Sequence, residues 1–303
     1  MHMSKLYQTT GCSISPILFH FFKIRFSLFM KDEILQDAPL VEIDDFKQWI
    51  LYESNDLLVL NKPGWLVCHP SKNGPLSSLV GTAKLYLGKE SIHLASRLDR
   101  ETSGVILMAK HRKAASCWQK GIEYKTVKRG YLAIMRGELV GEQLVEGYIG
   151  NDSASAVFVK QCVTGKSRKS KYSETMFTPL IAGEKHTLCL VRTNTGRKHQ
   201  IRVHAQSLGH SLVGDKLYGG NEHLYLEFCS NGWKEEWRSM LELNRQALHG
   251  RWLVNTETTE SFVAPLPMDI TNFYNEHFGN KGKGIRSVLK QADELFYQGI
   301  TKN

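Results

Sequence analysis

Apolar and polar residues alternate along the chain in runs that suit both strands and helices. Polar turn residues stop each apolar run, and the first run leads directly into the turn Asn61-Lys62-Pro63-Gly64. Four apolar runs have the length and the boundaries of buried strands, namely 57–60, 105–109, 131–135 and 187–191.

Helical spacing and capping residues predict three helices in the same part of the chain. Two are expected over 77–87 and 111–120, and a glycine follows each of them. The third is expected to begin at Thr195, a good N-cap residue, and to end near Gly209. Apolar residues recur between them at helical spacing, so one face of this helix should be buried.

These segments predict one mixed α+β domain over residues 51–270, because strand-like and helix-like stretches alternate and some spacings suit hairpins. Within it, residues 221–246 have the character of an insertion. Residues 271–303 are expected to form a C-terminal helical appendage with its helix at 285–296. Residues 1–50 are left as an N-terminal extension.

The first 31 residues contain no Asp or Glu but several Lys and Arg residues. This composition is typical of an organellar transit peptide, if the source is eukaryotic. Two other interpretations compete with it: translation that starts at Met30, or a loosely docked arm. A dispensable segment is favoured over a functional domain. The longest weakly charged apolar stretch, 17–30, contains Lys23 and Arg25, so no membrane span is predicted.

Composition narrows the protein class only slightly. The formal net charge of +9, from 39 basic and 30 acidic residues, suits a polyanionic partner but does not by itself indicate one. The six cysteines include no Cys-x-x-Cys pair, so neither a zinc site nor a redox motif is predicted. Reduced thiols in a cytoplasmic protein are the simplest interpretation.

The segment before the second apolar run carries four charges within five residues: Arg97, Asp99, Arg100 and Glu101. Composition alone favours a solvated loop with local ion pairs. An aspartate beside arginines stays ionised, however, because nearby positive charge stabilises the carboxylate. An ionised carboxylate can act as a nucleophile or a general base, so Asp99 is a catalytic candidate.

The predicted helix after Thr195 carries Arg202 at the border of its apolar face, where a guanidinium can reach a buried carboxylate. Its histidines have no partners at metal-ligand spacing. Tyr131 lies within a predicted strand and is by default a core residue, although a stacking platform for a base is the alternative. The cations of 165–171 suit either a solvated loop or contact with phosphates.

Taken together, these segments resemble the RluA family of pseudouridine synthases, over about residues 51–270. Ser96, Arg129 and Gly250 stand where His, Lys and Ala are usual. The first motif is one residue shorter after Pro63, and the span between Gly220 and Leu248 is long. The matching segments occur in the family's order: Asn61–Pro70, Ser96–Gly104, Arg129–Ala133, Thr195–His204, Gly209–Gly219, Leu248–Gly250 and Ala264–Pro267.

The resemblance implies a pseudouridine synthase fold: a mixed, mainly antiparallel sheet with flanking helices and a central catalytic cleft. It implies isomerisation of uridine in rRNA or tRNA without a cofactor or metal. Asp99 would be the essential carboxylate, Arg202 its partner and Tyr131 a stacking platform, while Arg97 would fill the gap left by the flipped base. The other residues expected to bind substrate are Thr102, Arg197, His199, Gln200 and, on RNA phosphates, Lys166, Arg168, Lys169 and Lys171.

Two other functions remain open from the sequence. A catalytically silent RNA-binding protein could share the fold, but it would be expected to lack Asp99, Arg202 or Tyr131. A glycosidase would need a second carboxylate, for which Glu101 is the candidate. We expect a monomer without an obligate protein partner.

Overall fold

The structure, a computed structural model, describes residues 40–69 and 75–301. Its centre is one eleven-stranded sheet in the order β1-β2-β4-β10-β5-β9-β8-β6-β7, with β3 beside β4 and β11 beside β10. Every pairing except β4 with β10 is antiparallel, which confirms the predicted mixed α+β class. The strands are β1 (Ile50–Glu53), β2 (Leu57–Lys62), β3 (His93–Leu94), β4 (Ser103–Ala109), β5 (Val127–Arg136), β6 (Gln143–Asn151), β7 (Gln161–Thr164), β8 (Lys171–Ala182), β9 (His186–Thr193), β10 (Leu248–Asn255) and β11 (Ser261–Val263).

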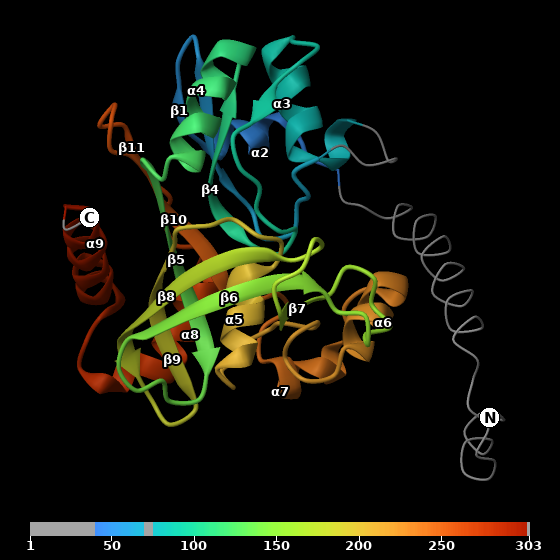
Figure 1. The fold of residues 1–303 in the computed structure, drawn as a ribbon, viewed down its shortest axis with the longest axis vertical. Helices are drawn as coiled ribbons and strands as arrows, with labels where there is room; N and C mark the ends of the chain where they lie inside the picture. Colours follow the sequence, from blue (N-terminus) through green and yellow to red (C-terminus); the bar gives the residue numbers. More distant parts are fainter. Residues whose placement is uncertain (1–39, 70–74, 302–303) are drawn as a thin grey trace, which may run out of the picture.

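Helices cover the two halves of this sheet separately (Figure 1). Helices α2, α3 and α4 lie with β1, β2 and β4, whereas the later helices surround the strands from β5 onward. The α-helices are α2 (Ile43–Gln48), α3 (Leu79–Leu87), α4 (Arg112–Glu123), α5 (Gln200–Ser207), α6 (His223–Asn231), α7 (Arg238–Leu241), α8 (Met268–Phe278) and α9 (Ile285–Thr301). No helix within the described ranges is both long and apolar enough to cross a bilayer.

Strands β5 and β9 are buried on both faces, which explains their continuous apolar runs. Leu132 and Ile134 pack in one cluster with residues of α8 and α9. Ala133 and Met135, which point to the opposite face, pack in another cluster with Ile201 of α5. The alternation therefore places α5 on one face of the sheet and the C-terminal helices on the other.

The two halves of the sheet meet where β4 runs parallel to β10 for only two residue pairs. Gly104 has a φ of +121°, and a Cβ atom there would lie 2.1 Å from the carbonyl oxygen of Gly250. Only glycine allows this approach. Gly250 is also paired with Tyr131 of β5, so the loop that carries Asp99 enters the sheet beside Tyr131.

Of the predicted helix boundaries that differ from the structure, two have an evident local cause. Helix α5 begins at Gln200 rather than at Thr195, because His199 before it has a left-handed backbone with φ +56°. Helix α4 continues through Gly121 to Glu123, since this glycine lies against Val127 instead of ending the helix.

The sequence predicted that the domain begins at residue 51, but the packed unit begins earlier in the chain. Val41 and Phe46 are buried in the cluster that contains Leu58 of β2. At the other end, the predicted 285–296 helix lies within α9, whose Phe296 stacks on Trp252 of β10 at 4.9 Å between ring centroids. The interpretations offered for the first 31 residues fall outside the described part of the chain.

Candidate active site

Arg202 lies between two carboxylates, Asp99 and Asp215. Its Nη1 donates to Oδ2 of Asp99 at 3.0 Å. Its Nε and Nη2 donate to the two carboxylate oxygens of Asp215 at 2.7 and 2.8 Å. The second pair is bidentate, and the backbone N–H groups of Leu217 and Tyr218 also donate to Asp215. Asp215 therefore fixes the plane of the guanidinium, and one edge of it remains for Asp99.

The surroundings of Asp99 keep it ionised. Burial works to raise its pKa, but the charges of His199 and Arg202 and hydrogen bonds from Arg202 and Gln246 lower it below the ordinary value. At neutral pH the charge of Arg202 carries this effect, because burial lowers the pKa of His199 to about 4. The Asp99 side chain is still 30% exposed, so an ionised carboxylate is open to a substrate.

His199 adjoins the same carboxylate. Its Nε2 lies 3.9 Å from Oδ2 of Asp99, and its Nδ1 lies 2.8 Å from the hydroxyl of Tyr218. The Tyr218 ring also lies beneath the Arg202 guanidinium, 4.8 Å from its Cζ. The His199 ring, just before α5, and the Tyr218 ring, in the segment after α5, therefore both lie against the Asp99–Arg202 pair.

The Asp99 loop is held at each of the next three residues, twice through the backbone and once through a side chain. The Lys62 ammonium donates to the carbonyl oxygen of Arg100 at 3.0 Å. Arg245 donates to the carbonyl oxygen of Glu101 at 3.0 Å, and Gln246 donates to the Thr102 hydroxyl at 2.6 Å. These contacts come from buried side chains far away in sequence, so the core fixes the path of the loop.

The 221–246 segment contributes a further clamp on this loop. The Nζ of Lys216, which is almost fully buried, donates to Glu101 at 2.7 Å and lies 4.3 Å from the ring centroid of Phe228. Trp233 lies on the same ammonium at 5.5 Å, and the Arg100 guanidinium also lies over Phe228. Two aromatic residues of the segment therefore pack on cations that position the loop.

Tyr131 is half-buried on the face of β5 that packs against α5. A Cβ atom on Gly250 would contact its ring at 3.5 Å and Leu98 at 3.7 Å. Since Leu98 precedes Asp99, the tyrosine ring lies next to the loop that bears the carboxylate. The structure therefore places Tyr131 beside the loop that carries Asp99, and Asp99 itself contacts Arg202.

The residues predicted to bind substrate differ in how free they are. Arg97 is exposed, whereas the Nε of Arg197 donates to the carbonyl of Tyr172. Thr102 is buried and accepts the hydrogen bond from Gln246. Arg97 is therefore the most accessible of these three side chains to a substrate, and Thr102 is the least accessible.

The prediction for Gln200 needs correction. Its amide oxygen accepts from the Thr195 hydroxyl and the Arg197 backbone, and its amide nitrogen donates to Glu174 and Thr175. The hydrogen-bonding capacity of this buried amide is thus used within the protein. Gln200 fastens the turn before α5 to β8.

The predicted phosphate-binding cations lie on the turn between β7 and β8 and at the first residue of β8. Hydrogen bonds between Ser167 and Ser170 close this turn. None of the four cations has an ion pair within the described ranges, and all four are exposed: Lys166, Arg168, Lys169 and Lys171.

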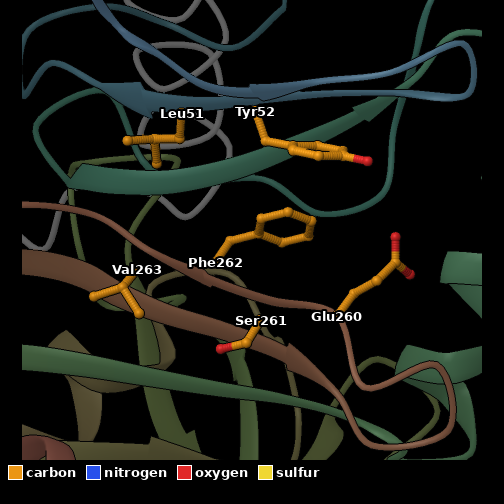
Figure 2. A pocket seen from close by; sticks show the side chains of 6 residues that line it. All are labelled: Leu51, Tyr52, Glu260, Ser261, Phe262 and Val263. Atoms are coloured by element: carbon orange, nitrogen blue, oxygen red, sulfur yellow. The ribbon is translucent and has the colours of Figure 1, made fainter.

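Two surface hollows lie outside this site. One, with a volume of about 390 Å³, opens between β1 and β11, where Tyr52 and Phe262 face each other (Figure 2). The other, of about 260 Å³, lies at the β8–β9 turn beside His186 and His277. Among the residues that the structure describes, no three His, Cys, Asp or Glu side chains gather to hold a metal ion.

Sequence reasoning missed the supports of the site. Asp215, Lys216 and Tyr218 were part of a matched segment but received no role, and Lys62 was assigned to a turn. The one available signal was an aspartate and a lysine within an apolar segment, where a charge must find a partner. The identity of that partner depends on contacts between distant segments.

The family model and the known proteins that match this chain are described as RNA pseudouridine synthases. The family model described as RNA pseudouridylate synthase matches residues 56–207. An uncharacterized RNA pseudouridine synthase of Bacillus subtilis, YhcT, is 35% identical over 76% of this chain and 72% of its own. The ribosomal large subunit pseudouridine synthase D of Vibrio cholerae is 32% identical over 78% and 72%. The solved human RNA pseudouridylate synthase domain containing 1 superposes with a TM-score of 0.54 at 26% identity, over 72% of this chain and 82% of its own.

Proposed function

The chain belongs to the RNA pseudouridylate synthase family and is an enzyme that isomerises uridine in RNA, and we propose that Asp99 is its reacting carboxylate. The observation that carries this assignment is the contact of 3.0 Å between Arg202 and Asp99, on a carboxylate that is held ionised yet open to solvent. A silent RNA-binding protein is not favoured, since Asp99, Tyr131 and Arg202 are all present, Arg202 contacts Asp99, and Tyr131 lies beside the Asp99 loop.

The reaction rearranges bonds within one nucleotide. The bond from C1′ to N1 of the base breaks, C5 of the same base bonds to C1′, and the proton on C5 is lost while N1 gains one. Because atoms and charge balance within the substrate and water, the protein needs to supply only a nucleophile or base and a fixed base orientation. Asp99 supplies the first, and the Tyr131 ring, by stacking on the base, supplies the second.

The uridine must leave its stack to reach Asp99, at a cost of a few kcal/mol. Arg97 is exposed two residues before Asp99, so its side chain is suited to fill the space left in the RNA. The exposed cations of the β7–β8 turn suit contacts with RNA phosphates, which offset the cost through release of counterions.

Large-subunit rRNA is our proposed substrate, with tRNA as the alternative. The proposal rests on the name of the Vibrio cholerae relative, a ribosomal large subunit pseudouridine synthase, which the chain matches over most of its length. We also propose that the enzyme acts as a monomer. Mapping pseudouridines in rRNA and tRNA from cells with and without the gene would identify the substrate.

The first prediction tests the role of Asp99. The protein is incubated with unmodified transcripts of large-subunit rRNA and of tRNAs, and pseudouridine is measured by mass spectrometry. The wild type should form pseudouridine, and Asp99→Asn should lose activity by at least about 10³-fold, because an amide is neither nucleophile nor base at neutral pH. RNA affinity should change little. Activity of the variant near that of the wild type would rule out Asp99.

A further inference from the structure

Tyr218 links the Asp99 site to strand β7 through two hydrogen bonds. Its hydroxyl accepts the backbone N–H of Gln161 at 2.9 Å and lies 2.8 Å from Nδ1 of His199. Tyr218 is only 1% exposed and the His199 side chain only 10%, so water competes little for these contacts. The rings meet edge to face, with 5.6 Å between their centroids.

These two hydrogen bonds determine which nitrogen of His199 carries the proton. A backbone N–H can only donate, so the Tyr218 oxygen accepts from Gln161 and its single hydrogen needs an acceptor. The other contact of that hydroxyl in the described structure is Nδ1 of His199. The arrangement that satisfies every group has Tyr218 donating to Nδ1, which leaves the imidazole proton on Nε2.

The far side of the ring supports the same tautomer. Nε2 lies 3.9 Å from Oδ2 of Asp99, so a proton there faces a carboxylate, whereas a lone pair there would face like charge. Burial, with the nearby charge of Arg202, lowers the pKa of His199 to about 4, so the ring is neutral at physiological pH. The left-handed backbone of His199 costs free energy and persists only where the surroundings fix the residue.

We propose that Tyr218 is a positioning residue for the pseudouridine synthase site: its hydroxyl fixes His199 as the Nε2–H tautomer and aims a neutral donor at the reacting carboxylate. The catalytic part of this inference rests on the proposed role of Asp99. A neutral donor keeps the carboxylate oriented without adding a second cation beside Arg202. The opposite tautomer would present a lone pair to Asp99 and to the incoming uridine.

The tautomer can be observed without any RNA. Long-range ¹H–¹⁵N spectra of protein labelled with ¹⁵N-histidine, assigned with His199→Asn, should show wild-type His199 with a protonated Nε2 and an unprotonated Nδ1 at pH 7. Asparagine suits the control because it accepts a left-handed backbone. In Tyr218→Phe the His199 signals should shift towards a mixture of tautomers. A protonated Nδ1 in the wild type, or an unchanged pattern in Tyr218→Phe, would overturn the proposal.

Single-turnover kinetics on the rRNA or tRNA transcript that the wild type modifies test the consequence. Tyr218→Phe and His199→Asn should each lower the rate by about 10-fold, because neither variant holds a polarised imidazole N–H towards Asp99 across the 3.9 Å gap. The double variant should be no slower than His199→Asn alone, because Tyr218 acts through His199. Multiplied effects would mean that Tyr218 is only structural.

Tyr274→Phe is the matched control, since it also removes a buried tyrosine hydroxyl bonded to the backbone, at the carbonyl of Lys283. It should lower stability and leave both the His199 spectrum and the rate unchanged. If no transcript is modified by the wild type, the proposed function fails, while the spectra still decide the tautomer.

Discussion

At the scale of single residues, the site depends on how one guanidinium is divided between two carboxylates. Asp215 takes the Nε and Nη2 of Arg202, and Asp99 receives only Nη1. If Arg202 paired bidentately with Asp99, both carboxylate oxygens would be occupied and the basicity of Asp99 would fall further. The Asp215 contact thus keeps Asp99 ionised and leaves part of it available.

Tyr131 provides the second prediction. We expect Tyr131→Phe to keep RNA affinity within about threefold of the wild type, because stacking uses the ring face, which phenylalanine retains. Tyr131→Ala should weaken binding by about 1–3 kcal/mol, the usual contribution of stacking on one base. Filter binding and thermal unfolding measure affinity and folding. Loss of binding in Tyr131→Phe with the fold intact would contradict the stacking role.

The sequence was informative about the charged residues of this site where a motif placed them beside a predicted strand or on a predicted helix. Asp99 and Arg202 could be found because their residue types imply a carboxylate and its partner. Gln200 could not be distinguished from its neighbours, since burial rather than residue type decides that its amide is used internally. Tyr218 carried no signal, because its role depends on contact with β7.

At the scale of elements, α6 and the turn after it support the catalytic loop. Phe228 and Trp233 lie on the Lys216 ammonium, which holds Glu101 two residues after Asp99. The predicted insertion is therefore packed against the site rather than protruding from the domain. A change in this segment is therefore expected to reach the catalytic loop, although the segment contains no candidate catalytic residue.

The third prediction follows from that contact. Phe228→Ala should lower kcat about fivefold with little change in RNA affinity, because the cation–π contact contributes about 1 kcal/mol to holding the loop. Met240→Ala, at a half-exposed position of α7, is the control and should leave kcat unchanged. Equal effects of the two changes would argue against a specific contact with the loop.

The β7–β8 turn gives the fourth prediction. Replacing its four cations with alanine should weaken RNA binding at all sequences and reduce the slope of log affinity against log salt by about 0.7–0.9 per lost phosphate contact. The rate at saturating RNA should stay the same. The control is a double variant, Arg286→Ala with Lys290→Ala, which removes two exposed cations on α9. An unchanged salt slope in the turn variant would exclude phosphate contact.

Elements were predictable where local pattern and tertiary contacts agree. The strands of the centre have continuous apolar runs because both faces are covered. The start of α5 was misplaced because Thr195 has the chemistry of an N-cap, but its hydroxyl bonds the Gln200 side chain and the Glu174 backbone instead. Helices α6 and α7 of the predicted insertion have only weak hydrophobic patterns in the sequence, so their formation depends on packing against the rest of the protein.

At the scale of the whole molecule, the core contains histidines that must stay neutral. Burial lowers the pKa of His204 to about 4 and that of His249 to about 3. The Ser173 hydroxyl donates to the carbonyl oxygen of Gly147, so it accepts a hydrogen bond from Nε2–H of His204. The Nδ1 of His204 then has no partner in the described structure, and protonating it would bury an unpaired charge.

The fifth prediction is that the protein loses stability as pH falls from about 6.5 towards 5. Between the unfolded pKa of about 6.5 and the folded value of about 4, the unfolded chain binds a proton at His204 that the native state does not. Each such histidine adds up to about 1.4 kcal/mol per pH unit to the slope of the unfolding free energy. Carboxylates with lowered pKa values, such as Glu222, contribute only below about 4.5, so they lie outside this window.

Urea denaturation between pH 7.5 and 5 measures this slope. His204→Gln should lower the overall stability, but it should also make the slope shallower below pH 6.5, because the titrating group is gone while an amide can still donate to Ser173. His223→Gln, at an exposed position of α6, should leave the slope as in the wild type. A slope in His204→Gln equal to that of the wild type would mean that this histidine is not held neutral. The acid sensitivity would then have to come from groups nearer the surface.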